Sequence, residues 1–231
     1  MDSPPTVKVV LLGESGVGKT CIISQFIQGD FNPDTVTSLS AQFISKTLEF
    51  NDLNKQIKYD IWDTAGQERF RALAKIFYKD AKVICLCYDI TNKKSFKELK
   101  DFWYEQQVKL NVDGEPIFAV VAHKNDLYEY QQVSDEEAKE FAKSINAHFY
   151  LTSAKKNILI TDLFIQSGKR FLDPNYNKET NSDKKETDKN EINKNENDTN
   201  ENKDDKDYER KVRANSVRIK EVSKQEKNAC C

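Results

Sequence analysis

A strand-like run followed by a glycine-rich turn constrains this chain more than any other feature. Residues 7–12 are mostly apolar and predict a buried strand, and residues 21–28 predict a short helix. Between them, residues 13–20 read GESGVGKT. Such a turn lets backbone N–H groups point at a phosphate chain, and the helix that follows favours negative charge. Lys19 can reach the β and γ phosphates and the Thr20 hydroxyl can hold Mg²⁺, so the segment predicts a nucleotide phosphate site.

Length and charge limit the remaining classes. With 231 residues and a net charge of -2, the chain suits one domain plus an extension and argues against a protein that binds nucleic acid along its whole length. The first six residues lack the apolar core of a signal peptide, and no apolar run approaches roughly 18 residues. We therefore expect a cytosolic protein. Cys21, Cys85 and Cys87 are interpreted as small core side chains, and no cysteine spacing indicates zinc.

The order of strands and helices predicts an α/β domain. Runs at 42–50 and 56–62, joined by a polar turn, predict a hairpin, whereas residues 30–41 and 64–78 are irregular. Strands at 82–88, 116–122 and 148–151 alternate with helices at 94–110, from Ser134 onward and at 158–171. Ser134 and Glu137 form a capping box. This alternation predicts a mostly parallel sheet with helices on both faces and one antiparallel edge strand.

The composition changes after Pro174. Residues 175–207 are almost entirely charged or polar, with Ile192 as the only aliphatic side chain. Such a segment buries too little apolar surface to offset its ordering entropy, so we expect it to be disordered. The predicted division is a domain at residues 1–172 and a tail at residues 173–231.

A second motif follows the hairpin. Residues 62–70 read WDTAGQERF. Asp63, at the end of a strand beside the phosphate loop, is placed to support Mg²⁺. Gly66 can bring its backbone N–H to a γ-phosphate, and Gln67 can orient an attacking water.

Three further segments join these two motifs: YDIT at 88–91, HKND at 123–126 and TSAK at 152–155. With them, residues 6–172 resemble the Ras-like small GTPases and, within them, the Rab family. The resemblance implies a P-loop NTPase fold, a six-stranded, mostly parallel sheet flanked by five helices. It also implies GTP or GDP with Mg²⁺ as ligands, slow GTP hydrolysis, and effectors recruited in the GTP state. An exchange factor, a GTPase-activating protein, a prenylation escort and a GDP-dissociation inhibitor are the implied regulators.

The resemblance also implies roles for single residues. Lys124 packs on the guanine ring, Asp126 accepts its two N–H donors, Ala154 donates a backbone N–H to it, and Phe31 packs against its edge. Gln67 and Lys19 are the implied catalytic residues, and Thr20, Ser38 and Asp63 the implied Mg²⁺ residues. The implied nucleotide-binding residues are Glu14, Ser15, Gly16, Val17, Gly18, Lys19, Thr20, Cys21, Phe31, Ser38, Gly66, His123, Lys124, Asp126, Leu127, Ser153, Ala154 and Lys155.

Three departures from the family pattern stand out. His123 replaces the usual asparagine or threonine, Ser38 replaces a threonine, and Ser40 replaces a glycine. Residues 77–79 read FYK in place of Tyr-Tyr-Arg. Phe43, Trp62 and Phe77 still supply the three aromatic side chains of the family's effector patch, with a core role for Trp62 as the alternative.

The chain ends in Cys230 and Cys231, which resemble the doubly geranylgeranylated end of Rab proteins. Two lipid chains give stable anchoring. Residues 210–227 carry seven basic and two acidic side chains, which can attract anionic lipid, with a solvated linker as the alternative. The predicted location is therefore the cytosolic face of an intracellular membrane, with a soluble cytosolic pool. The phosphate loop and residues 41–43 bear a weak likeness to endosomal Rabs.

Two alternatives stay open. A nucleotide-locked scaffold without turnover is motivated by His123, Ser38 and Ser40, and Gln67 argues against it. A P-loop kinase or ATPase is disfavoured because Asp126 and the TSAK segment indicate guanine.

Overall fold

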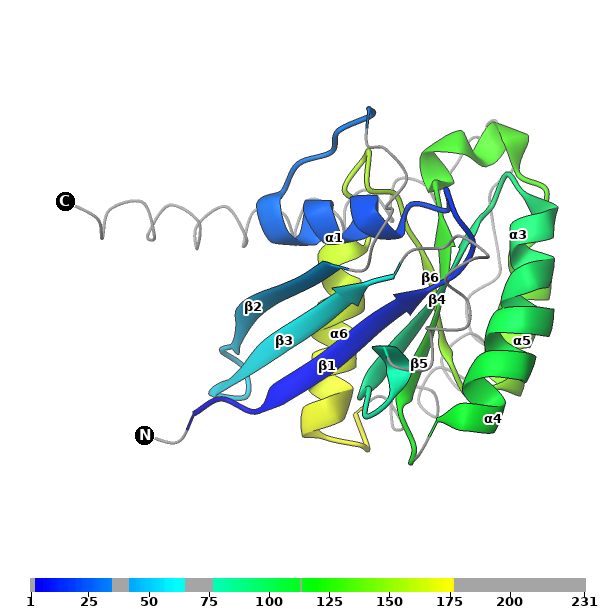
Figure 1. The fold of residues 1–231 in the computed structure, drawn as a ribbon. Helices are drawn as coiled ribbons and strands as arrows, with labels where there is room; N and C mark the ends of the chain where they lie inside the picture. Colours follow the sequence, from blue (N-terminus) through cyan, green and yellow to red (C-terminus); the bar gives the residue numbers. More distant parts are fainter. Residues whose placement is uncertain (1–2, 35–41, 65–76, 113, 177–231) are drawn as a thin grey trace, which may run out of the picture. The chain divides into compact units, whose positions relative to one another are not determined.

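The computed structural model describes residues 3–34, 42–64, 77–112 and 114–176. Their centre is a six-stranded sheet in the order β2-β3-β1-β4-β5-β6 (Figure 1). β2 runs antiparallel to β3, and every other neighbouring pair is parallel. The predicted sheet with one antiparallel edge strand is confirmed. Its strands are β1 (Thr6–Leu12), β2 (Gln42–Phe50), β3 (Lys55–Asp63), β4 (Val83–Asp89), β5 (Ile117–His123) and β6 (His148–Leu151).

Helices cover both faces of this sheet (Figure 1). One face carries α1 (Lys19–Gln28) and α6 (Ile160–Leu172), and the opposite face carries α3 (Lys93–Glu98) and α5 (Asp135–Ser144). A wide π-helix, η2 (Leu99–Val108), and the short α4 (Lys109–Asn111) continue α3. A 3₁₀-helix, η3 (Asn125–Tyr130), follows β5.

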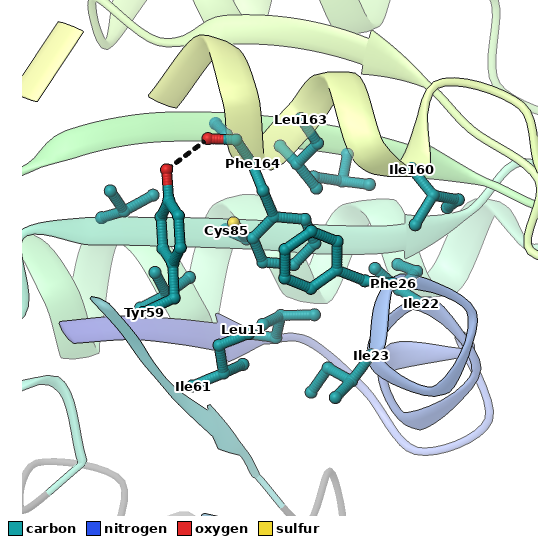
Figure 2. Close-up of a cluster of buried hydrophobic side chains, with 14 of the residues drawn as sticks. Leu11, Ile22, Ile23, Phe26, Tyr59, Ile61, Cys85, Ile160, Leu163 and Phe164 are labelled. Carbon is teal, nitrogen blue, oxygen red and sulfur yellow. Dashed lines mark hydrogen bonds between the residues drawn. The ribbon is translucent and has the colours of Figure 1, made fainter. Parts of the chain in front are cut away.

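The core between the sheet and the α1–α6 layer is built around aromatic rings (Figure 2). Phe26 of α1 stacks on Phe164 of α6 with ring centroids 3.7 Å apart. The Tyr59 hydroxyl of β3 donates to the Phe164 carbonyl oxygen at 2.8 Å, and this side chain is fully buried. These contacts fix α1, the helix that begins at the phosphate loop, against the sheet.

The second core lies under α3, η2 and α5. Val10 and Leu12 of β1 contribute to it from the sheet, and Trp103 of η2 contributes a fully buried indole. The alternation of Val9 and Leu11 on one face with Val10 and Leu12 on the other explains why β1 reads as a continuous apolar run.

The structure differs from the sequence-based expectations in four places. The helix expected at 94–110 is an α-helix only at its ends, with the π-helix between them. Phe77 and Tyr78 are helical, inside a segment predicted to be irregular. The 3₁₀-helix after β5 has too little apolar periodicity to be predicted. Cys21 is half-exposed in the first turn of α1, so the interpretation of it as a core side chain is wrong, whereas Cys85 and Cys87 are buried.

Two local predictions are confirmed. Residues 51–54 form the turn between β2 and β3, which pair along their whole length. The Ser134 hydroxyl accepts from the Glu137 backbone N–H at 3.2 Å and caps α5, which confirms one half of the predicted capping box. The Glu137 carboxylate pairs with Lys100 at 3.1 Å instead of completing the box.

Of the predicted tail, residues 177–231 lie outside the described residues. The division into residues 1–172 and 173–231 therefore stays a prediction. Among the described residues, no helix has both the length and the apolar character needed to cross a bilayer.

Candidate functional site

The site lies at the edge of the sheet where the parallel strands end. β1 leads into the phosphate loop, and β3, β4 and β5 end in Asp63, Asp89 and His123. The chain leaves β1 toward β3 on one side and returns to β4 on the other. In open α/β sheets, such a reversal at the carboxyl ends of the strands is where ligands bind.

Gly13 brings the phosphate loop against β4. Its φ is 146°, and a Cβ added there would lie 2.1 Å from the Cys87 carbonyl oxygen. Any side chain would push the loop away from the sheet, so glycine is required by the close approach. The start of the loop is therefore fixed by the strand beside it.

The Lys19 ammonium is held inside the loop. Its side chain is buried, and Nζ donates to the carbonyl oxygens of Gly13 at 2.8 Å and Glu14 at 2.9 Å. Burial lowers the pKa of Lys19, while the nearby Cys87, Asp63 and Glu14 act in the opposite direction. A phosphate anion at this position would favour the charged ammonium.

The amino end of α1 faces the same position. Its N-cap, Gly18, has a left-handed backbone with φ 98°, and among the described residues no side chain caps this end. The first turn of α1 also holds no acidic residue. A helix end of this kind presents backbone N–H groups and a partial positive charge to an anion.

Thr20 and Asp63 form the part of the site suited to a cation. The Thr20 hydroxyl donates to Asp63 Oδ2 at 2.6 Å, and Asp63 is buried at the end of β3. Parallel pairing of β1 with β3 places Asp63 opposite Leu11, and the Thr64 hydroxyl donates to the Leu11 carbonyl oxygen at 2.6 Å. Hydroxyl and carboxylate oxygens are the hard ligands that Mg²⁺ prefers, so these residues fit the ion.

His123 connects two loops. Its Nδ1 lies 2.9 Å from the Thr152 hydroxyl oxygen, and a Cβ added at Gly18 would lie 2.5 Å from His123 Cδ2. The Thr152 hydroxyl also reaches the Ala122 carbonyl oxygen at 3.3 Å. Burial lowers the pKa of His123 to about 4, and the Lys124 cation adds to this effect. A neutral imidazole therefore fills the space between the phosphate loop and the loop after β6.

Lys124 and Asp126 follow His123 and project from the start of η3. The Lys124 ammonium pairs with Asp89 at 2.7 Å. Asp126 Oδ1 accepts from the Ser153 hydroxyl at 2.6 Å. The loop of Ser153 is tied to this segment because the Asn125 backbone N–H donates to the Thr152 carbonyl oxygen at 3.0 Å. A planar ligand with adjacent N–H donors would find a carboxylate acceptor here, since Asp126 is only partly buried.

The structure brings most of the predicted residues to one edge. The phosphate loop, Thr20, Asp63, His123, Lys124 and Asp126 share it, with Ser153 and Ala154 buried beside them. Phe31 lies in the segment after α1, and Leu127 and Lys155 are exposed. Ser38, Ser40, Gly66, Gln67, Cys230 and Cys231 lie outside the described residues.

Three residues of the site were not predicted from the sequence. Asp89 pairs with Lys124, Thr152 supports His123, and the Trp103 indole N–H donates to Glu14 Oε1 at 3.0 Å. Asp89 and Thr152 stand inside the YDIT and TSAK segments, at the ends of strands. This position in the sequence could have identified them as residues of the site. No local pattern connects Trp103 to Glu14.

A separate aromatic cluster is defined as Phe43 of β2, Trp62 of β3 and Phe77 of the short helical segment before β4. Trp62 has ring centroids 5.2 Å from Phe43 and 5.7 Å from Phe77. Phe43 is 51% exposed, which is unusual for a ring of this size, and the other two are half-buried. The three predicted patch residues are therefore contiguous.

Comparison with known proteins agrees with this geometry. The model of the Ras family matches residues 8–173. Ras-related protein Rab-22A of Homo sapiens is 40% identical over 166 residues, which cover 71% of this chain and 82% of that protein. Ras-related protein Rab-21 of Bos taurus is 41% identical over 166 residues, covering 72% of this chain and 73% of that protein, and Rab-21 of Homo sapiens is also 41% identical. The chain belongs to the Ras family and, within it, to the Rab small GTPases, which hydrolyse GTP.

Proposed function

We propose that this GTPase is a membrane-anchored switch of vesicle traffic that cycles between GDP and GTP states. The observation that carries the proposal is the convergence of Lys19, the Thr20–Asp63 pair and Asp126 at one sheet edge. Each group matches one part of a Mg²⁺–guanine nucleotide: the phosphates, the cation and the base. Relatives named Rab-22A and Rab-21 support a role among the Rabs of endosomal membranes.

The proposed chemistry is the in-line attack of water on the γ-phosphate of GTP, which breaks the bond from the γ-phosphorus to the bridging oxygen and releases GDP and phosphate. Lys19 and the amide groups at the start of α1 stabilise the charge that develops on the phosphates. Gln67 orients the water. Mg²⁺, when bound, would be held by Thr20, Asp63 and Ser38 and would neutralise phosphate charge. Intrinsic turnover is slow, and an activating protein supplies roughly 10³- to 10⁵-fold.

The switch follows from contacts that exist only with the third phosphate. Ser38 and Gly66 are the proposed partners of the γ-phosphate and its cation, and loss of that phosphate releases both segments. The residues of the aromatic cluster lie next to these two segments in the sequence. Effectors, the exchange factor and the activating protein are therefore proposed to bind at this cluster and to distinguish the two nucleotide states there. The escort protein and the dissociation inhibitor are proposed to handle the lipidated chain.

The first experiment tests nucleotide binding and turnover. Purified protein should carry GDP or GTP, and bound GTP should decay in a single-turnover assay. Gln67→Leu should keep the bound nucleotide while hydrolysis falls, and Gln28→Leu, an exposed change at the far end of α1, should behave as wild type. Stable GTP in the wild type would favour the nucleotide-locked scaffold instead. Displacement of GTP by excess ATP would favour a kinase or ATPase.

The second experiment tests the lipid anchor. Full-length protein with Cys230→Ser and Cys231→Ser should move from the membrane fraction to the soluble fraction of cells. A variant with the basic side chains of residues 210–227 changed to glutamine, but with both cysteines kept, should remain partly bound. Persistent membrane binding of the cysteine variant would contradict the anchor.

A further inference from the structure

The helix that covers β4 changes its hydrogen-bond pattern in the middle. Leu99–Val108 is a π-helix of ten residues between the α-helical segments Lys93–Glu98 and Lys109–Asn111. At its end, the Lys109 backbone N–H donates to the carbonyl oxygen of Tyr104, five residues earlier. Wide helical turns of this kind are rare and frequently occur at functional sites.

The wide turn sets the position of Trp103. The buried residues of η2 are Leu99, Trp103 and Val108, whose spacing is four residues and then five. The Trp103 ring is fully buried among the side chains under α3 and α5, and Phe102 packs edge-on against it at 5.3 Å. The core therefore fixes the direction in which the indole N–H points.

That N–H reaches the phosphate loop. Trp103 Nε1 donates to Glu14 Oε1 at 3.0 Å, across 89 residues of sequence. Glu14 follows Gly13, whose backbone is pressed against Cys87, and its own carbonyl oxygen accepts from Lys19 at 2.9 Å. Glu14 thus links two parts of the structure. Its side chain contacts the buried Trp103, and its backbone carbonyl oxygen contacts Lys19.

The bond also matters for charge. Glu14 is the acidic residue of a loop whose other groups attract phosphate, and a carboxylate near a triphosphate is unfavourable. The indole of Trp103 is a hydrogen-bond donor only, so it binds a carboxylate oxygen of Glu14 and keeps it on the side of the loop that faces the core. Hydrogen bonds to charged groups are the stronger kind, which makes a buried indole suited to this purpose.

We propose that Trp103 is a positioning residue for the phosphate loop and slows nucleotide release by holding Glu14. This inference rests on the proposed nucleotide site. It assigns to η2 a role that the sequence motifs do not contain: the wide turn delivers an indole N–H to the second residue of the loop. Trp103 acts through Glu14 and does not touch the nucleotide.

The test measures the dissociation rate of a fluorescent GDP analogue from full-length protein. Trp103→Phe keeps an aromatic ring and removes the donor, and it should raise the rate about tenfold, the equivalent of one charge-assisted hydrogen bond. Tyr104→Phe, a neighbouring change on η2 that removes only a hydroxyl, should leave the rate near wild type. Glu14→Gln keeps an oxygen acceptor but makes the bond a neutral one, so it should raise the rate by less than Trp103→Phe does. Adding Glu14→Gln to Trp103→Phe should be no worse than Trp103→Phe alone.

A second measurement follows the indole directly. The chain has two tryptophans, so an NMR spectrum of ¹⁵N-labelled protein should show two indole N–H signals. Glu14→Ala should shift the slowly exchanging signal of the buried Trp103 and should also accelerate GDP release. A signal unchanged by Glu14→Ala, or equal release rates for wild type and Trp103→Phe, overturns the inference while leaving the proposed function intact. A wild type that binds no guanine nucleotide overturns both.

Discussion

His123 lies against Gly18, so that one imidazole fills the space between the phosphate loop and the loop after β6. A Cβ added at Gly18 would be 2.5 Å from His123 Cδ2 and 2.8 Å from Nε2. The family pattern has asparagine or threonine at the histidine position. The larger ring is accommodated here because Gly18 presents no side chain to it.

Gly18→Ala should therefore destabilise the fold and the site together. The change adds a clash with a buried ring to the cost of a left-handed backbone, which is about 1–2 kcal/mol for residues with a Cβ. Gly29→Ala is the matched control, because Gly29 has φ 70° and open space around its Cβ position. Urea unfolding should show a clearly larger loss for Gly18→Ala. Equal losses would mean that the imidazole moves aside freely.

Acid should weaken the protein through His123. The pKa of this imidazole is near 6.5 in the unfolded chain, and burial lowers it to about 4 in the folded chain. The free energy of unfolding is therefore highest above pH 6.5 and falls as the pH drops through this window, by roughly 3 kcal/mol at most for one such group. Urea unfolding at several pH values measures this slope.

A second histidine titrates in the same range and has to be separated. Burial, together with Arg170, lowers the pKa of the half-buried His148 to about 4. His123→Asn should remove the larger part of the slope, and His148→Asn the smaller part, since solvent screens the more exposed ring. A slope unchanged by His123→Asn would contradict the buried neutral imidazole.

Tyr59→Phe should destabilise the core under α1 without disturbing its packing. The change removes the hydroxyl that donates to the Phe164 carbonyl oxygen and should lower the free energy of unfolding by about 1 kcal/mol. Tyr128→Phe, at a 59% exposed position, is the control and should have little effect. The unfolding temperatures of the wild type and both variants test this prediction. Equal unfolding temperatures for wild type and Tyr59→Phe would contradict the assigned hydrogen bond.

Asp126→Asn should weaken guanine nucleotide binding. The variant keeps the shape of the side chain but loses the charged acceptor that stands beside the Ser153 hydroxyl. The loss of a hydrogen bond to a charged group predicts roughly 10- to 100-fold weaker binding, measured by titration with labelled GDP. Glu129→Gln removes an exposed charge of the same 3₁₀-helix and should bind normally.

The phosphate loop and the hairpin were predictable because their signals are local. The apolar side chains of residues 7–12 alternate between the two cores, and the glycine-rich loop follows them directly. Likewise, Ser134 caps α5 by accepting from the Glu137 backbone N–H, within one helical turn. In each case the side chains that determine the structure lie within a few residues of one another.

The features that were missed depend on contacts between distant segments. The spacing of Trp103 and Val108 by five residues departs from α-helical periodicity, but only packing under the sheet makes a π-helix favourable. The Lys124–Asp89 pair follows from the register that sets Asp89 beside His123, which no single-segment pattern contains. Lys124 also has φ 67°, a conformation that nothing in its own side chain demands.

The aromatic cluster has one further consequence. Phe43 stands two residues after segment 35–41, while Trp62 and Phe77 bracket segment 65–76 along the chain. A protein that binds all three rings at once would contact the chain next to both segments. In the proposed switch, such a protein would bind tightly only when the same nucleotide sets the conformation of both segments.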